Sequence, residues 1–188
     1  MTPAALIFDF DGTLVDSMPV HFKCWQTVLA PVGLTFDEPT FYAWGGVSTR
    51  EIVARLAKAQ GVAVDVESII ARKEVLAIEH AHEATLIEEV VSIARDHRGR
   101  LPMAVATGGT RAVVEPRLAS TGMASWFDAV VTADDVKRCK PDPETFLLAA
   151  ERLGVDPAAC RAYEDAEAGL ASARAAGMDV IDVRTLRS

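Results

Sequence analysis

Five short apolar runs, each closed by a turn and followed by a stretch with helical spacing, constrain the fold of this chain more than any other feature. Taken as strands, these runs are residues 4–10, 102–107, 127–133, 160–164 and 179–183. Their apolar content is typical of strands buried on both faces, as in a parallel sheet between two layers of helices. The alternation therefore predicts an α/β fold with a doubly wound parallel sheet.

Six stretches have apolar residues spaced by three and four, and we predict that they are helices: 19–29, 49–59, 66–81, 110–120, 143–153 and 166–176. The first three lie in a connection of about 70 residues, which is too long for a simple crossover between two strands. We therefore predict a core formed by residues 1–15 and 85–188 and a small helical cap formed by residues 16–84. Within the cap, we expect the loop of residues 44–47 to face the site.

Composition excludes several classes of protein. The 188 residues are 50% hydrophobic and 24% charged, which is typical of a folded globular chain. The formal charge of -8 disfavours binding to nucleic acid. No apolar run approaches the length that crosses a bilayer, and the first nine residues have no secretory character, so we expect a cytoplasmic protein without a membrane contact. The three widely spaced cysteines favour reduced thiols. We expect a monomer, with a weak dimer as the alternative.

Two carboxylates follow the first apolar run directly. Asp9 and Asp11 are separated by one residue, so their side chains point to the same side where the strand ends. Such a pair repels itself unless a cation lies between the two groups, which calls for Mg²⁺ or a shared proton. Gly12 lets backbone N–H groups approach an anion closely. The alternative is a solvated strand end with an Asp-Gly turn.

Two further segments carry groups that can bind phosphate. Thr107 and Gly108 end the second run with a hydroxyl and exposed backbone amides at a helix start, although this is also an ordinary strand-to-helix turn. Lys140 precedes Pro-Asp-Pro in an extended segment, where its ammonium can neutralise phosphate and a nearby carboxylate. A solvated surface lysine is the alternative for Lys140.

A second pair of acids closes the fourth run. Glu164 and Asp165 stand immediately before a predicted helix, so N-capping by Asp165 is one interpretation. The carboxyl ends of parallel strands meet at one edge of the sheet, so this pair adds negative charge to a site where Asp9 and Asp11 already require a cation. We therefore favour a metal site.

These motifs, in this order and strand context, resemble the four motifs of the haloacid dehalogenase-like (HAD) superfamily. They are Asp9-Phe10-Asp11-Gly12-Thr13, Thr107, Lys140-Pro141 and Glu164-Asp165. The resemblance covers nearly the whole chain and implies a Rossmann-like core, with a cap similar to that of the β-phosphoglucomutase-like group. Residues 126–131, 140–146 and 173–179 are especially similar to bacterial fructose-1-phosphate and 6-phosphogluconate phosphatases.

The resemblance also implies roles for the core residues. Asp9 is expected to attack phosphorus and form an aspartyl-phosphate, while Asp11 protonates the leaving alkoxide and then deprotonates water. Thr107 and Lys140 are expected to hold the equatorial oxygens of the transferred group, next to the backbone of Gly12 and Gly108.

The cofactor implied by the resemblance is Mg²⁺. Its expected ligands are Asp9, the main-chain carbonyl of Asp11 and Asp165, with Glu164 nearby. The ion would shield the charge that otherwise repels phosphate from Asp9.

Substrate contacts in the cap are expected from His21, Gly46 and Arg50. His21 lies where several sugar-phosphate members of this group carry a histidine, and it would orient Asp11 or touch the substrate; a surface histidine is the alternative. Residues 45–50 resemble the cap loop of the phosphomutases, but the arginine expected directly after Gly-Val-Ser is Thr49 here, with Arg50 one position later.

These observations predict an Mg²⁺-dependent phosphatase of small phosphorylated sugars, of the fructose 1-phosphate or 6-phosphogluconate type. β-Phosphoglucomutase is the alternative enzyme, and two departures oppose it. Thr49 replaces the cap arginine, and Thr110-Arg111 stands where mutases tend to have Lys-Asn. A receiver-like phospho-Asp signalling module is the alternative outside enzymes, but receivers have no large insertion after the first strand.

Overall fold

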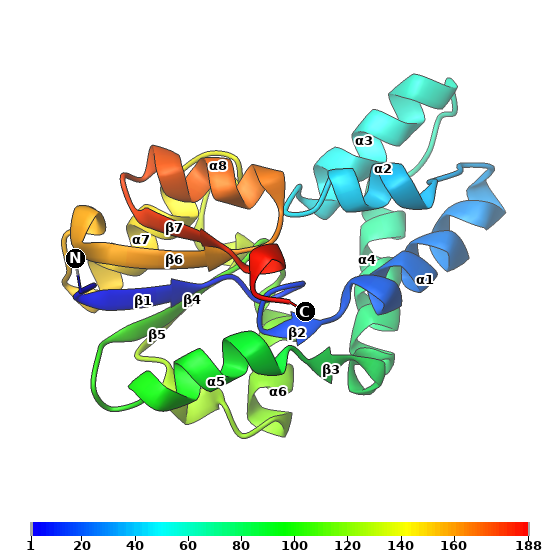
Figure 1. Cartoon of the computed structure of the whole chain (residues 1–188). Helices are drawn as coiled ribbons and strands as arrows, with labels where there is room; N and C mark the ends of the chain where they lie inside the picture. The colour runs from blue at the N-terminus through cyan, green and yellow to red at the C-terminus, as the bar shows by residue number, and fades with distance from the viewer. Residues whose placement is uncertain (1, 188) are drawn as a thin grey trace.

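Five parallel strands form one sheet in the order β5-β4-β1-β6-β7 in a computed structural model of the chain, which describes residues 2–187. The strands are β1 Ala5–Phe8, β4 Met103–Ala106, β5 Ala129–Val131, β6 Cys160–Glu164 and β7 Asp179–Asp182. Each of them lies within one of the five runs predicted from the sequence. The predicted α/β fold with a parallel sheet is therefore confirmed (Figure 1).

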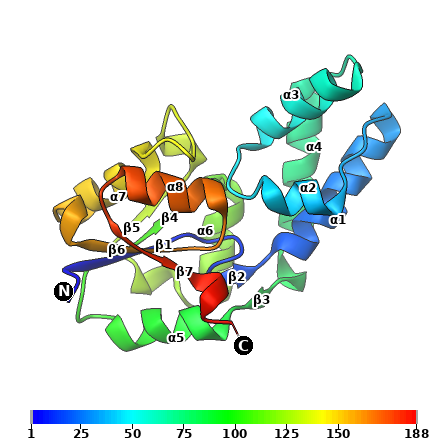
Figure 2. The ribbon, with the colours of Figure 1, turned by 45° about the horizontal axis from the view of Figure 1, so that its top comes forward.

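Helices cover both faces of the sheet, because successive strand residues point to opposite sides. Leu6 and Phe8 pack in one cluster with residues of α5 Glu88–His97 and α6 Arg111–Ser120. Ala5 and Ile7 pack in the other cluster with residues of α7 Glu144–Leu153 and α8 Glu167–Ala175. Figure 2 shows α5 below the sheet and α7 and α8 above it. The sheet is thus doubly wound.

Four helices form a separate body beside the sheet (Figures 1 and 2): α1 Met18–Leu29, α2 Glu38–Ala43, α3 Thr49–Gln60 and α4 Val66–Glu79. They enclose their own apolar cluster, which includes Trp25, Phe36, Phe41 and Val53. The six predicted helices are all present, with ends that differ by at most two residues. The short helix α2 was not predicted, because six residues are too few to display a helical period.

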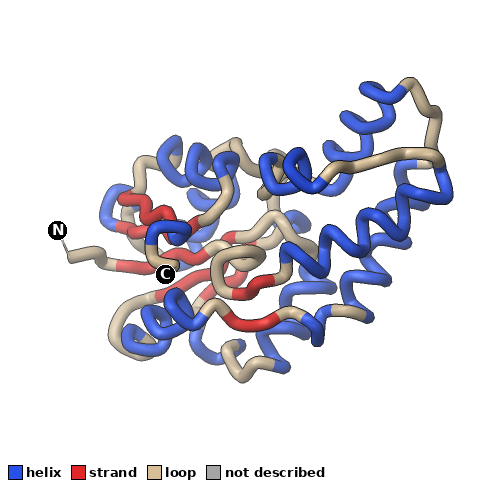
Figure 3. Tube along the Cα trace, turned by 45° about the vertical axis from the view of Figure 1, so that its right-hand side comes forward, coloured by secondary structure: helices blue, strands red, loops and turns tan. Residues whose placement is uncertain are grey.

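A small antiparallel ribbon joins the helical body to the sheet. Its strands are β2 Val15–Asp16 and β3 Thr85–Leu86, drawn in Figure 3 as two short red segments. Two-residue strands give no alternation, so the sequence did not predict them. The ribbon brings the two ends of the long insertion together, next to the end of β1.

The carboxyl ends of the strands point toward the helical body (Figure 1). Asp9 follows β1, Thr107 follows β4, and Glu164 is the last residue of β6. Because neighbouring parallel strands end at the same edge, the polar residues after them meet there. Within residues 2–187, no helix is long and apolar enough to cross a membrane.

Candidate active site

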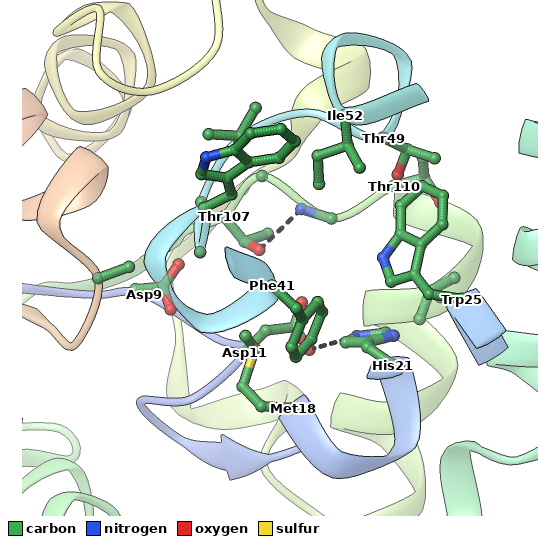
Figure 4. Close-up of a pocket in the computed structure, with 18 of the residues that line it drawn as sticks. Asp9, Asp11, Met18, His21, Trp25, Phe41, Thr49, Ile52, Thr107 and Thr110 are labelled. Carbon is green, nitrogen blue, oxygen red and sulfur yellow. Dashed lines mark hydrogen bonds and ion pairs between the residues drawn. The ribbon is translucent and has the colours of Figure 1, made fainter. Parts of the chain in front are cut away.

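A pocket lies between the edge of the sheet and the helices α1–α4 (Figure 4). Most residues predicted for the site line it, and they come from both bodies. From the sheet side the predicted residues are Asp9, Asp11, Thr107, Gly108, Glu164 and Asp165, and from the helical side His21 and Gly46. The local geometry explains how each of these residues is held.

Lys140 lies under the floor of the pocket, between two acids. Its Nζ is 2.6 Å from Oδ1 of Asp9 and 3.4 Å from Oε1 of Glu164. Burial lowers the pKa of Lys140, but the charges of Asp9 and Glu164 outweigh burial and raise it above its usual value. The ammonium therefore stays charged, and it is not the solvated surface lysine that the sequence left as an alternative.

Asp9, Glu164 and Asp165 bring one carboxylate oxygen each within 4.8 Å of one another. Burial and the neighbouring Asp9 raise the pKa of Asp165 to about 7. Burial raises the pKa of Glu164 well above its usual value, and it raises that of Asp9 despite Lys140. Three acids thus share one ammonium, and the group has the hard oxygen donors that a divalent cation prefers.

Two glycines make room for these acids. A Cβ at Gly12 would collide with the Asp165 carboxylate, and φ is +85° at Gly12, where side chains are strained. A Cβ at Gly169, on α8, would collide with the carboxylate of Glu164. Thr13 Oγ1 also donates a hydrogen bond of 3.0 Å to Asp165. The sequence gave no signal for Gly169, because it lies in an ordinary helical stretch.

Asp11 faces away from these acids and toward α1. It accepts hydrogen bonds from Ser17 Oγ at 2.5 Å and from His21 Nε2 at 3.1 Å. Burial raises the pKa of Asp11, but His21 and Ser17 outweigh burial and lower it to about 2. On its other side, His21 Nδ1 lies 3.5 Å from Nζ of Lys73 on α4. Figure 4 shows the contact between Asp11 and His21 as a dashed line.

Thr107 and Gly108 lie where the helical body touches the sheet body. The hydroxyl of Thr107 accepts a hydrogen bond of 3.0 Å from the N–H of Gly109. A Cβ on Gly108 would be 3.3 Å from the carbonyl oxygen of Gly46, so the two loops meet backbone to backbone. Gly46 also approaches Lys140, whose Cδ is 3.7 Å from the position of a Gly46 Cβ. The loop expected to face the site therefore does so.

Arg50, which was expected to contact substrate, is not among the residues that line the pocket. Its guanidinium forms a bidentate ion pair with Glu67 of α4, and both side chains are more than 60% exposed. The helix α3 begins at Thr49 with Ser48 as its N-cap, and neighbouring residues of a helix point about 100° apart. Thr49 lines the pocket, so Arg50 turns to the surface.

Sequence reasoning missed Lys73 and Trp25 as pocket residues. Both lie within predicted helices, where spacing alone does not tell a core position from a pocket position. Trp44, in the loop expected to face the site, lines the pocket and also packs with its ring centroid 5.5 Å from that of Phe36.

The fold and the pocket together define a class of α/β enzyme. In this class, polar residues at the carboxyl ends of parallel strands line a pocket that a group of helices covers. The family model for haloacid dehalogenase-like hydrolases matches residues 3–177, and the chain belongs to that family. The resemblance carried by the four motifs is thereby confirmed, as is the prediction of a hydrolase. Membership also sets aside the signalling receiver.

Curated relatives and solved structures agree with this membership. The chain is 42% identical to fructose-1-phosphate phosphatase YqaB of Escherichia coli, over 97% of each chain. It is 32% identical to a phosphorylated carbohydrates phosphatase of Thermotoga maritima, over 94% of this chain and 83% of the other. A β-phosphoglucomutase of Clostridium difficile has the same fold, with a TM-score of 0.86 and 24% identity over 95% of this chain and 83% of the other.

Proposed function

We propose that the protein is an Mg²⁺-dependent phosphatase that hydrolyses small phosphorylated sugars through an aspartyl-phosphate on Asp9. The observation that carries the proposal is the contact of 2.6 Å between Asp9 and the buried ammonium of Lys140, beside the acids Glu164 and Asp165. The relatives named as phosphatases of fructose 1-phosphate and of phosphorylated carbohydrates support the substrate class. We further propose a monomeric, cytoplasmic enzyme.

The residues present fit a magnesium ion. Asp9, Asp165 and the main-chain carbonyl of Asp11 would hold it, with Glu164 nearby, and these are oxygen donors only. Gly12 supports this fit, because any larger residue would push the Asp165 carboxylate out of the group. When bound, the ion would supply positive charge that screens Asp9 from the phosphate and polarises the phosphoryl oxygens.

The first step is the attack of an Asp9 oxygen on phosphorus. A bond forms between that oxygen and phosphorus, the bond to the sugar oxygen breaks, and Asp11 gives its proton to the leaving alkoxide. Lys140 and Thr107 hold the equatorial oxygens and stabilise their charge. The negative charge of the bound phosphate favours the protonated form of Asp11 that this step requires.

The second step returns Asp9 to its starting form. Water attacks phosphorus, Asp11 accepts the proton of that water, and the bond between phosphorus and Asp9 breaks to release phosphate. The contacts of Asp11 with Ser17 and His21 keep it ionised and oriented for this proton transfer. We propose that His21 is therefore a positioning residue supplied by the helical body.

We propose that residues 16–84 act as a cap that selects the substrate, over a core of residues 1–15 and 85–188. Several observations support hydrolysis over a mutase reaction in this cap. The guanidinium of Arg111 is held by Glu115 and Asp135, and Arg111 does not line the pocket. The corresponding positions in the lining of the pocket are Thr49 and Thr110. A mutase must grip a second phosphate, and hydroxyls hold a phosphate less firmly than guanidinium or ammonium groups do.

The test is release of inorganic phosphate from fructose 1-phosphate with Mg²⁺ and with EDTA. We expect turnover only with Mg²⁺. Phosphorus NMR on β-glucose 1-phosphate, with a bisphosphate primer, distinguishes the two reactions, and we expect free phosphate to appear before glucose 6-phosphate. Glucose 6-phosphate accumulating first would favour the mutase, and equal turnover in EDTA would refute the metal dependence.

A further inference from the structure

One wall of the pocket carries a buried hydroxyl that the protein itself does not satisfy. Oγ1 of Thr110 is fully buried and has no hydrogen-bond partner among residues 2–187. Thr110 is the N-cap of α6, but its side chain does not accept a capping hydrogen bond. In Figure 4, Thr110, Thr49 and Trp25 appear on the right of the pocket, while Asp9 lies on the left. A buried hydroxyl without a partner is costly, and a ligand hydroxyl at this wall would remove the cost.

A carboxylate faces the same space from the cap. Glu74, on α4, lines the pocket, and within the described part of the chain it forms neither an ion pair nor a hydrogen bond. Its neighbour Lys73 forms no ion pair with it, although the two charges act on each other through space. The Lys73 ammonium lies 3.5 Å from His21 Nδ1 and 5.7 Å from the centroid of the Trp25 ring. Glu74 is thus a hydrogen-bond acceptor and a negative charge that the cap adds to the lining of the pocket.

Acids outnumber bases among the charged residues that line the pocket. Its lining residues include five acids and, as bases, only Lys73 and His21, both of which are engaged near Asp11. Arg50 and Arg111 directly follow Thr49 and Thr110 in the sequence. Neither arginine lines the pocket, and both form ion pairs with acids outside it. A carboxylate accepts hydrogen bonds from sugar hydroxyls but repels another anion, and the repulsion is strong where water is scarce.

We infer that Glu74, Thr110 and Thr49 form a subsite for the neutral, hydroxylated end of a phosphomonoester, and that Glu74 rejects substrates with a second anionic group. This inference rests on the proposed function and narrows its substrate class. It selects neutral sugar or polyol monophosphates of the fructose 1-phosphate type. It disfavours sugar-acid phosphates such as 6-phosphogluconate, and sugar bisphosphates.

The test compares sorbitol 6-phosphate with 6-phosphogluconate, two open-chain compounds that differ only in a hydroxymethyl group against a carboxylate. Each is measured by kcat/KM or, where it is not turned over, by inhibition of aryl phosphate hydrolysis. We expect the wild type to prefer sorbitol 6-phosphate by about tenfold or more. Glu74→Gln should reduce this preference about tenfold, and Glu74→Lys should reverse it. Glu79→Gln removes an exposed charge from the same helix and is the matched control.

Thr110 gives a second readout. Thr110→Val should raise KM for sorbitol 6-phosphate about tenfold, because the buried hydroxyl that binds the polyol is lost, and Thr110→Ser should restore most of the affinity.

The outcomes separate the two proposals. An enzyme that releases no phosphate from any phosphomonoester with Mg²⁺ refutes the proposed function. An active enzyme whose preference is the same in wild type, Glu74→Gln and Glu74→Lys overturns only the subsite, as does a wild type that prefers 6-phosphogluconate.

Discussion

The two walls of the pocket are built differently. On the sheet side, Asp9, Lys140 and Glu164 are each at most 4% exposed and are joined through the ammonium of Lys140. On the cap side, most lining residues are apolar or aromatic, and the aromatic ones are Trp25, Phe41 and Trp44. A buried charge is stable only beside specific charged or hydrogen-bonding partners, whereas aromatic side chains are stabilised by close packing alone. We therefore expect the sheet side to determine the chemistry and the cap to be the part that variation in sequence can change at small cost.

Specific polar and backbone contacts join the two walls. His21 reaches Asp11 from α1, and the backbone of Gly46 meets the loop at Gly108. Because these contacts close part of the pocket, we expect the cap to open and close with turnover. Variants on each wall should therefore fail in different ways.

The largest effect is expected from Asp9→Asn on the sheet wall. The amide nearly preserves shape but is a poor nucleophile, and it gives up the ion pair with Lys140. We expect kcat for fructose 1-phosphate to fall at least about 1,000-fold with an unchanged circular dichroism spectrum. Asp96→Asn, at an exposed position of α5, is the control. Activity within tenfold of the wild type would exclude Asp9 as the nucleophile.

A smaller effect is expected from Asp165→Ala, which removes one proposed metal ligand and leaves the others. The Mg²⁺ concentration for half-maximal activity should rise about tenfold or more, and high Mg²⁺ should restore part of the turnover. A Mg²⁺ titration of phosphate release measures this, with Asp96→Ala as the control. A titration curve that matches the wild type would rule out Asp165 as a ligand.

The sheet wall could be predicted from the sequence for a physical reason. Polar residues such as Asp9, Thr107 and Glu164 follow apolar runs directly, and parallel strands must end at one edge. We can therefore predict that these residues meet without knowing how the side chains pack. The acids Asp9, Glu164 and Asp165 do meet, although residues 9 and 164 are far apart in the chain.

The cap wall could not be predicted in the same way. Lys73 and Glu74 line the pocket because of the way α4 is rotated against α1 and α3. Helical spacing in the sequence does not fix that rotation. The orientation of residues 45–50 is equally hard to predict. A shift of one position decides whether Thr49 or Arg50 faces the pocket. The ribbon strands β2 and β3 are too short to leave a pattern.

A moderate effect is expected where the cap touches Asp11, the proposed catalytic acid. His21→Gln removes the ring that joins Asp11 to Lys73, while Asp11 keeps its hydrogen bond from Ser17. We expect kcat to fall about tenfold with little change in the Mg²⁺ requirement, because no proposed metal ligand is altered. His82→Gln, at an exposed site after α4, is the matched control. A change in Mg²⁺ affinity as large as that of Asp165→Ala would contradict a positioning role.

The smallest effect is expected from Arg50→Ala, on the outer surface of the cap. Arg50 pairs with Glu67 in solvent, and exposed ion pairs contribute little to stability. We expect kcat/KM for fructose 1-phosphate to stay within about twofold of the wild type and Tm within about two degrees. Thr49→Val, one position earlier, should raise KM several-fold because its hydroxyl lines the pocket. Together the two variants test the register of α3. If Arg50→Ala weakened substrate binding more than Thr49→Val, the cap would have to turn α3 on closing, so that Arg50 rather than Thr49 meets the sugar.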